Sequence, residues 1–158
     1  MYNLFEEMLA VVDDLEANQI DYALCGGLAV AIHGFSRATK DIDLLIRRED
    51  LERILVVVRS RGFNLEAGIL PMGAGEATPL DIFRISKVDG KNLLTLDLLI
   101  VNMPLQPAWD AREYLEVQGT KLQVVSPAGL YIMKKLSGRP QDIVDLQRLG
   151  LWPDDPTP

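Results

Sequence analysis

The sequence predicts a single domain of the α/β or α+β class, with helices packed on a mixed β-sheet. Three observations support this prediction. The chain has 158 residues, the length of one domain with a sizeable core. Segments with the 3.6-residue period of amphipathic helices alternate with segments that have the two-residue period of strands. Asp89-Gly90 marks a tight hairpin between two of those strands.

The first part of the chain alternates between helical and strand patterns. Asn3 is suited to cap the first helix, and Gly34 and Gly62 are suited to end two later ones. The expected elements are a helix over 4–18, a strand over 22–25, a helix over 28–33, a strand over 41–46 and a helix over 47–61.

The remainder of the chain contains the hairpin and a helical end. Ser126-Pro127 combines a helix cap with a proline at the first helical position. The expected elements are strands over 63–67, 81–88 and 91–101, a turn-rich loop over 68–79, a short helix from 108, edge strands near 114–117 and 121–124, and helices over 126–138 and 139–149. We assign residues 1–150 to the domain and residues 151–158 to a disordered tail.

The composition is that of an ordinary globular protein, with 48% hydrophobic and 25% charged residues. A formal net charge of −7 argues against a broad surface for duplex nucleic acid, which needs clustered lysine and arginine. The single cysteine, Cys25, excludes an internal disulfide. The start of the chain is acidic rather than basic, and no apolar run approaches the roughly 18 residues of a membrane span. We therefore expect a cytoplasmic protein without a membrane partner.

The strand over 41–46 opens with two carboxylates on one face. Asp41 and Asp43 alternate with apolar residues, so their side chains point the same way and lie about 7 Å apart. Two like charges at this spacing are unfavourable unless a cation lies between them, and carboxylate oxygens suit Mg²⁺ or Mn²⁺. The alternative is a solvated strand start that carries two surface aspartates.

Two further features strengthen the metal interpretation. Gly26-Gly27 stands between a short strand and a helix, where glycine lets backbone amides approach an anion. Asp97 stands in the middle of a strand that is apolar on both faces. A carboxylate buried there needs a hydrogen-bond donor or a metal, and we interpret Asp97 as a third ligand.

Two cations and the only histidine precede the paired aspartates. Arg37 is a candidate for contact with a phosphate or a second substrate, because its planar fork suits such groups, and Lys40 is a weaker candidate. Charge balance with the two aspartates is an equally good explanation of both. His33 on a short helix is more simply a packed or surface residue than a catalytic one.

These residues together resemble a known signature. Gly26-Gly27, followed after thirteen residues by Asp41-Ile42-Asp43-Leu44, and then Asp97 in an apolar strand, resemble the DNA polymerase β-type nucleotidyltransferase superfamily. The run from Arg37 to Asp43 and the segment over 134–145 resemble its small bacterial branch, which is related to lincosamide nucleotidyltransferases and AbiEii-type toxins. The resemblance covers most of the chain.

The resemblance implies a fold and a reaction. It implies a nucleotidyltransferase fold and the transfer of a nucleoside monophosphate from an NTP to an acceptor hydroxyl, with two divalent ions held by Asp41, Asp43 and Asp97. Asp97 would lie nearest the acceptor and could serve as its general base. By the same resemblance Lys134 would lie near the nucleotide phosphates. A surface ion-pair network of Lys134, Arg139, Asp142 and Asp145 is the alternative.

Three functional hypotheses follow. The first, which we favour, is a metal-dependent nucleotidyltransferase that acts on a small molecule. The second keeps this chemistry with tRNA or a partner protein as the acceptor. The third is a non-catalytic nucleotide-binding module, and the presence of all three carboxylates argues against it.

Overall fold

The computed structural model describes residues 3–34, 39–72, 80–137, 144 and 147. The helices are α1 (Leu4–Ala17), α2 (Gly26–Ile32), α3 (Leu51–Arg59), α4 (Gln106–Asp110) and α5 (Pro127–Ser137), with short 3-10 turns at Arg48–Asp50 and Met103–Leu105. The strands are β1 (Ala23–Cys25), β2 (Asp41–Ile46), β3 (Leu65–Met72), β4 (Leu80–Asp89), β5 (Asn92–Ile100), β6 (Glu113–Val117) and β7 (Thr120–Val124).

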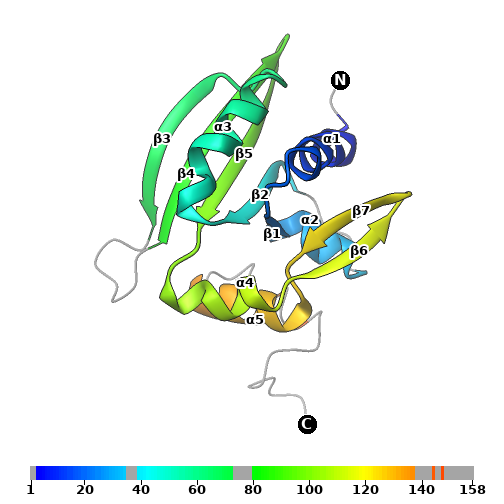
Figure 1. The fold of residues 1–158 in the computed structure, drawn as a ribbon, viewed down its shortest axis with the longest axis vertical. Coiled ribbons are helices and arrows are strands. Elements are labelled where there is room, and N and C mark those ends of the chain that lie inside the picture. The colour runs from blue at the N-terminus through cyan, green and yellow to red at the C-terminus, as the bar shows by residue number, and fades with distance from the viewer. Residues whose placement is uncertain (1–2, 35–38, 73–79, 138–143, 145–146, 148–158) are drawn as a thin grey trace.

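The strands form one mixed sheet in the order β3-β4-β5-β2-β1-β7-β6. Neighbouring strands are antiparallel except for two pairs, β2 with β5 and β1 with β7. The predicted α/β or α+β class with a mixed sheet is therefore confirmed. The parallel pair β2 and β5 lies in the middle of the sheet (Figure 1). Two strands far apart in the sequence thus lie side by side, as their patterns suggested.

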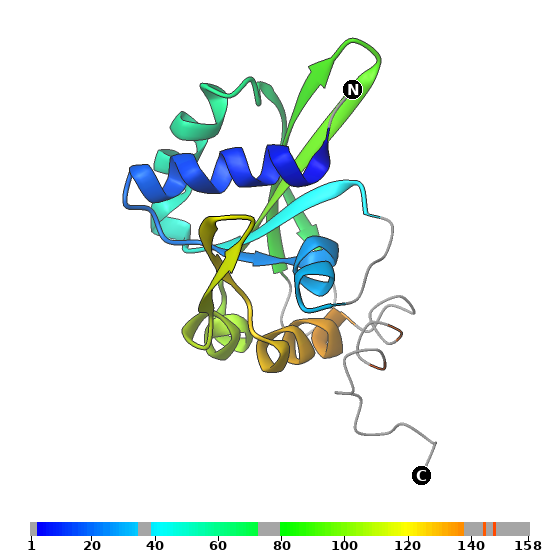
Figure 2. The same ribbon diagram turned by 90° about the vertical axis from the view of Figure 1, so that its right-hand side faces the viewer.

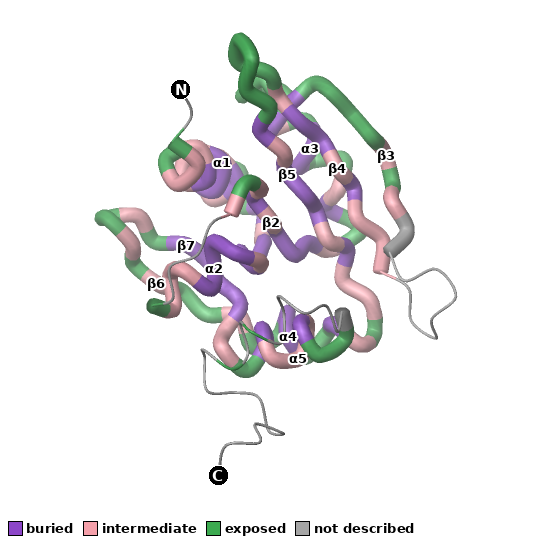
Figure 3. Tube along the Cα trace, turned by 180° about the vertical axis from the view of Figure 1, so that it is seen from behind, coloured by how far each residue is buried: buried purple, intermediate pink, exposed green. Residues whose placement is uncertain are grey.

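Helices lie on both sides of the sheet. In two perpendicular views α1 and α3 cover one face, and α4 packs against α5 at the opposite end of the molecule from the β4–β5 hairpin (Figures 1 and 2). One part of the core is buried between α1, α3 and the central strands, and the same cluster continues into α2, α4 and α5 (Figure 3). Val12, Ile42 and Leu96 are wholly buried there. Alternate residues of β2 and β5 are consequently apolar and face these helices.

Most predicted elements are present with small differences at their ends. The strand over 41–46 has the predicted bounds, and Asn3 caps α1 by accepting a hydrogen bond from the Glu6 amide at 3.1 Å. Helix α2 begins at Gly26 rather than at 28, so the glycine pair is the first turn of the helix. The predicted helix over 139–149 and the predicted tail lie outside the described residues, apart from 144 and 147.

The predicted loop over 68–79 is wrong at its start. Residues 68–72 belong to β3, which extends to Met72 and pairs with β4 through a register shift between Glu66 and Gly68. The glycine at the shift and the proline at 71 obscure the two-residue period. Both are tolerated because β3 is an edge strand, where a bulge is common and one amide needs no partner in the sheet.

Tyr22, just before β1, connects this strand with α1 and β7. Its side chain is wholly buried, and its hydroxyl donates to Glu16 at 2.9 Å and accepts from the backbone amide of Gln123 at 3.1 Å. Burial, together with the negative charge of Glu16, raises the pKa of the Tyr22 hydroxyl far above its usual value. Tyr22 therefore remains a neutral donor at every physiological pH.

We expect Tyr22→Phe to lower the free energy of unfolding by about 1 to 3 kcal/mol, because the buried Gln123 amide loses this acceptor. Urea unfolding measures the change. Tyr114→Phe is the matched control, because the Tyr114 side chain is exposed on β6, and its stability should stay within about 0.5 kcal/mol of wild type. Equal midpoints for the two variants would contradict this role of Tyr22.

Candidate active site

Four ionisable side chains form a row across the centre of the sheet. Cys25 pairs with Asp43, Asp43 pairs with Asp97, and Asp97 pairs with Arg84, on the neighbouring strands β1, β2, β5 and β4. Residues directly opposite each other in a sheet point to the same face. The row therefore lies on the face opposite the buried apolar residues of β2 and β5, and the pairing of β2 with β5 brings the two predicted aspartates together.

Asp41 lies two residues before Asp43 on the same face. It is opposite Thr95, whose hydroxyl lies 3.2 Å from the hydroxyl of Ser86. Burial raises the pKa of the Asp41 carboxyl, and the negative charge of Asp97 raises it further, whereas Arg84 and Lys40 act in the opposite direction. Asp41 and Asp97 are thus close enough to repel each other, which is the property expected of a cation site.

Arg84 holds Asp97 in a two-point ion pair. The Arg84 Nε donates to Asp97 Oδ1 at 2.8 Å, and a terminal nitrogen of Arg84 donates to Oδ2 at 2.9 Å. The Asp97 side chain is only 7% exposed, whereas that of Arg84 is 43% exposed. This parallel geometry is the strongest form of carboxylate recognition by arginine. It explains how a carboxylate is accommodated inside an apolar strand.

Gly26 brings the start of α2 against Asp43. Its φ is +66°, a left-handed conformation that favours glycine. A Cβ at this position would lie 2.1 Å from Asp43 Oδ2, which is closer than any atomic contact allows. Only glycine therefore lets the backbone of α2 approach the Asp43 carboxylate. Gly27 follows as a buried residue of the same helical turn.

Lys134 on α5 adds a buried cation beside this face. Its side chain belongs to the few buried charged groups of the described chain, and its charge acts on Cys25. Burial raises the pKa of the Cys25 thiol, as do the charges of Asp43 and Asp97, while Lys134 opposes them. Cys25 is therefore a neutral thiol and not a nucleophile. The start of α2 and, through Lys134, the last turn of α5 both border the carboxylate face.

The other predicted candidates have different positions. Lys40 is exposed and is adjacent to Asp41, on which its charge acts. The His33 ring donates through Nε2 to the Val125 carbonyl at 2.9 Å, so it joins the end of α2 to the segment before α5, in agreement with a packing role. Arg37, Asp142 and Asp145 lie outside the described residues.

The donor set suits a hard divalent cation. Three carboxylates on one face supply the oxygen ligands that Mg²⁺ and Mn²⁺ prefer. Within residues 3–34, 39–72 and 80–137, no three Asp, Glu, His or Cys side chains already converge on one point. Both oxygens of Asp97 face Arg84 instead. The residues fit a cation by chemistry and by register, and to ligate it Asp97 would have to share or exchange its contact with Arg84.

Arg84 is the residue of this face that sequence reasoning did not single out. The turn at Asp89-Gly90 gave the signal, because it fixes the register of the β4–β5 hairpin. Asp89 pairs with Asn92, and counting outward from this pair places Arg84 opposite Asp97. A lone arginine on a strand opposite a lone aspartate therefore predicts the pair.

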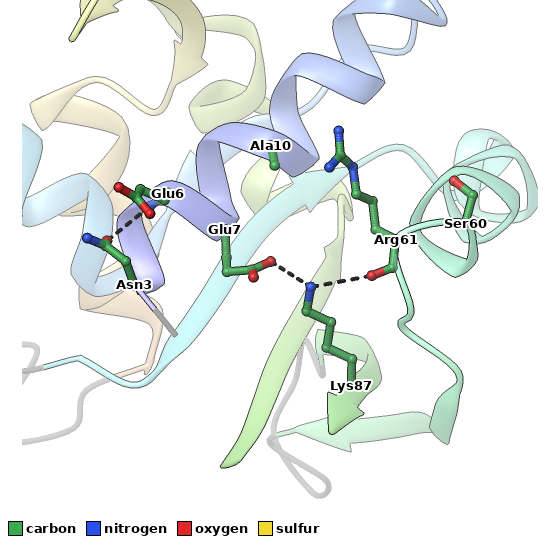
Figure 4. A pocket seen from close by; sticks show the side chains of 7 residues that line it. All are labelled: Asn3, Glu6, Glu7, Ala10, Ser60, Arg61 and Lys87. Carbon is green, nitrogen blue, oxygen red and sulfur yellow. Dashed lines mark hydrogen bonds and ion pairs between the residues drawn. The ribbon is translucent and has the colours of Figure 1, made fainter. Parts of the chain in front are cut away.

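A polar surface pocket lies on the other face of the sheet (Figure 4). It is lined by Asn3, Glu6, Glu7, Ala10, Ser60, Arg61 and Lys87. Lys87 alternates with Ser86 along β4 and hence points away from the carboxylates; its Nζ contacts Glu7 at 2.7 Å and donates to the Arg61 carbonyl at 3.3 Å. These contacts attach α1 to β4, and none of Asp41, Asp43 and Asp97 lines the pocket.

A mixed sheet that carries paired aspartates beside a glycine turn defines a nucleotidyltransferase fold. The sequence matches, over residues 1–153, the family model described as nucleotidyltransferase of unknown function (DUF6036), and the chain belongs to this family. The predictions that the chain is an enzyme and a nucleotidyltransferase are thereby confirmed. No curated protein matches the sequence as a relative.

Solved structures share the fold at low sequence identity. TM1012 of Thermotoga maritima, assigned as a nucleotidyltransferase, is 14% identical with a TM-score of 0.63, and the match covers 91% of this chain and 90% of that one. An antigenic nucleotidyltransferase-like protein of Paracoccidioides brasiliensis is 19% identical with a TM-score of 0.55, covering 94% and 74%. The crystal structure of ANT(2'')-Ia is 17% identical with a TM-score of 0.53, covering 92% and 84%.

Among the described residues, no helix is both long and apolar enough to span a membrane.

We expect Gly26→Ala to be more destabilising than an equivalent change elsewhere. Gly90→Ala is the matched control, because Gly90 has a φ of +61° and a methyl group there would meet nothing within 4 Å. Both variants incur the left-handed backbone penalty of about 1 to 2 kcal/mol. Gly26→Ala should lose about 1 to 3 kcal/mol more, through the clash with Asp43. Urea unfolding without added metal measures both, and equal losses would contradict the close approach.

Proposed function

We propose that this protein transfers a nucleoside monophosphate from an NTP to an acceptor hydroxyl, most simply on a small molecule, and that the transfer depends on Mg²⁺ or Mn²⁺. The observation that carries the proposal is the register of β2 and β5, which places Asp43 directly beside Asp97 with Asp41 on the same face. An apolar sheet has no structural need for three carboxylates on one face, since each costs free energy to desolvate.

The bonds exchanged are those of an in-line displacement. The acceptor oxygen attacks the α-phosphorus of the NTP, the bond from that phosphorus to the β-phosphate oxygen breaks, and pyrophosphate leaves. Asp97, the most buried of the three carboxylates in the row, takes the proton of the acceptor hydroxyl. Asp41, Asp43 and Asp97 would hold the divalent cation, which when bound neutralises the phosphate charge and lowers the acceptor pKa.

The nucleotide lies toward the opposite end of the row from Arg84 in this proposal. Gly26 and Gly27 let backbone amides approach the phosphates beside Asp43, and the buried ammonium of Lys134 supplies a positive charge on the same side. Positioning and charge neutralisation account for most of the acceleration in such transfers. Arg37 and Lys40 remain candidates for further phosphate or acceptor contacts.

Two observations support a small-molecule acceptor. The net charge of −7 is unfavourable for a long polyanion such as tRNA. ANT(2'')-Ia, which shares the fold, has been crystallised in complex with adenylyl-2''-tobramycin, a small molecule that carries an adenylyl group. tRNA and a partner protein are alternative acceptors, and the labelling experiment below distinguishes them.

The first experiment tests the metal site. Mg²⁺ or Mn²⁺ together with NTP should raise the melting temperature of the wild-type protein, because a ligand that binds only the folded state stabilises it. The double variant Asp41→Asn/Asp43→Asn should lose the metal-dependent part of this shift. Asp81→Asn is the control, because Asp81 pairs with Arg48 away from the row and should keep the full shift. An unchanged shift in the double variant would refute the assignment.

The second experiment identifies the acceptor. The protein is incubated with each NTP labelled at its α-phosphate, Mg²⁺ and a cell extract, and small molecules, RNA and proteins are then separated. We expect label in the small-molecule fraction, with the rate reduced at least about 100-fold in Asp97→Asn, which removes a base and a metal ligand.

Label in RNA or protein would contradict the small-molecule acceptor while preserving the chemistry. Equal labelling by Asp97→Asn would contradict the role of Asp97. Asp89→Asn, a change at the far end of the same hairpin, should label at the wild-type rate.

A further inference from the structure

Arg84 compensates the charge of Asp41, Asp43 and Asp97, which together are called the carboxylate row below. It engages both oxygens of Asp97, at 2.8 and 2.9 Å, from the neighbouring strand of the same hairpin. Its electrostatic influence extends beyond this partner. Arg84 lowers the pKa of Asp41, and the charges of Asp41 and Asp43 add to the hydrogen bond with Asp97 in raising the pKa of Arg84. One guanidinium therefore faces the same three carboxylates that the proposed function assigns to a divalent cation.

The two partners of this pair differ in their freedom to move. Asp97 is 7% exposed and fixed in the middle of β5, whereas the Arg84 side chain is 43% exposed. Gly68 lies opposite Arg84 on the edge strand β3, and a methyl group there would meet nothing within 4 Å. The guanidinium is exposed and the residue opposite Arg84 has no side chain, so Arg84 can shift away while the carboxylate stays in place.

We infer that Arg84 is the resident counter-ion of the carboxylate row: it holds Asp97 in position when no metal is bound, and it competes with the divalent cation for the oxygens of Asp97. This inference rests on the proposed metal-dependent function. Arg84 is a positioning residue in this scheme, because it acts on the reaction through Asp97.

Competition has a thermodynamic consequence. A positive side chain next to a divalent cation repels it, whereas the same side chain stabilises three neighbouring carboxylates when the cation is absent. Arg84 therefore stabilises the metal-free protein more than the metal-bound protein. Because linkage is reciprocal, removing Arg84 must strengthen metal binding by the same factor by which bound metal weakens the contribution of Arg84 to folding.

The test compares Mn²⁺ binding to metal-stripped wild type, Arg84→Met and Arg59→Met by titration calorimetry at pH 8, without nucleotide. Arg59 is the matched control, because it pairs with Glu66 on the opposite face of the same sheet and is similarly exposed. Arg84→Met should melt at a lower temperature than wild type without metal, yet bind Mn²⁺ at least about five-fold more tightly. Arg59→Met should bind Mn²⁺ like wild type.

A purely structural ion pair predicts a different result. Arg84→Met would then lose stability equally with and without Mn²⁺, and its affinity for Mn²⁺ would equal that of wild type, which would overturn the inference. Weaker Mn²⁺ binding in Arg84→Met would also overturn it. If wild type and variant both fail to bind Mn²⁺, the proposed metal dependence fails as well as the inference. Equal or weaker binding by the variant, with wild type still binding, overturns the inference alone, so the two failures are distinguishable.

Two further measurements keep the inference testable if Arg84→Met does not fold. Arg84→Lys keeps the charge but loses the two-point geometry, and its affinity for Mn²⁺ should lie between those of wild type and Arg84→Met. In wild-type protein labelled with ¹⁵N-arginine, the Arg84 Nε–H resonance should shift on addition of Mg²⁺, whereas the Arg59 resonance should not. An Arg84 resonance unchanged at saturating Mg²⁺ would overturn the inference.

Discussion

The parallel pairing of β2 with β5 is the contact on which the rest of the site depends. It places Asp43 and Asp97 side by side in the most buried part of the sheet, where two adjacent negative charges would be strongly unfavourable by themselves. The surrounding residues offset this cost locally. Arg84 neutralises one end of the row, and the buried Lys134 adds positive charge on the same face near Cys25 at the other end. The cluster is thus an electrostatic unit across four strands and a helix, in which Arg84 and Lys134 offset part of the charge of three carboxylates.

The two-residue period of the central strands divides structural from chemical work. One face of β2 and β5 is apolar apart from Asn92 at the start of β5, and it buries core residues beneath α1 and α3, so this face contributes much of the stability. The other face carries the carboxylates, the arginine and the hydroxyl pair of Ser86 and Thr95. This second face also contains core residues, because Leu45 follows Asp43 on it and is wholly buried.

Local sequence patterns were sufficient for the parts of the fold that local forces determine. The strand over 41–46 and the hairpin at Asp89-Gly90 follow from side-chain alternation and turn chemistry, and they place Asp97 on a strand that pairs with β2. The continuation of β3 to Met72 did not follow, because a bulge and a proline interrupt its alternation. Pairing with β4 overrides these local signals, and the sequence of β3 alone contains no information about its partner.

The same distinction between local patterns and long-range packing applies within the site. The candidate ligands Asp41, Asp43 and Asp97 could be proposed because charged residues stand out in apolar strands, whereas the proximity of Lys134 depends on packing between the two ends of the chain. His33 contributes to this packing, since its ring donates to the Val125 carbonyl while the Val125 amide donates to the Leu24 carbonyl. These two hydrogen bonds fix the segment before α5 against the end of α2 and the strand β1.

The position of α5 relative to the carboxylates is therefore set by hydrogen bonds outside the carboxylate row. A nucleotide bound between Gly26 and Lys134, as proposed, would span α2 and α5, one from the first fifth of the chain and one from its last. The two ends of the proposed site are thus specified differently. Register within one hairpin determines how Arg84 meets Asp97, and long-range packing determines how close Lys134 comes to Cys25, the residue before the glycine turn. We infer that changes at the interface of α2, β7 and α5 would alter nucleotide affinity before they alter the carboxylate row.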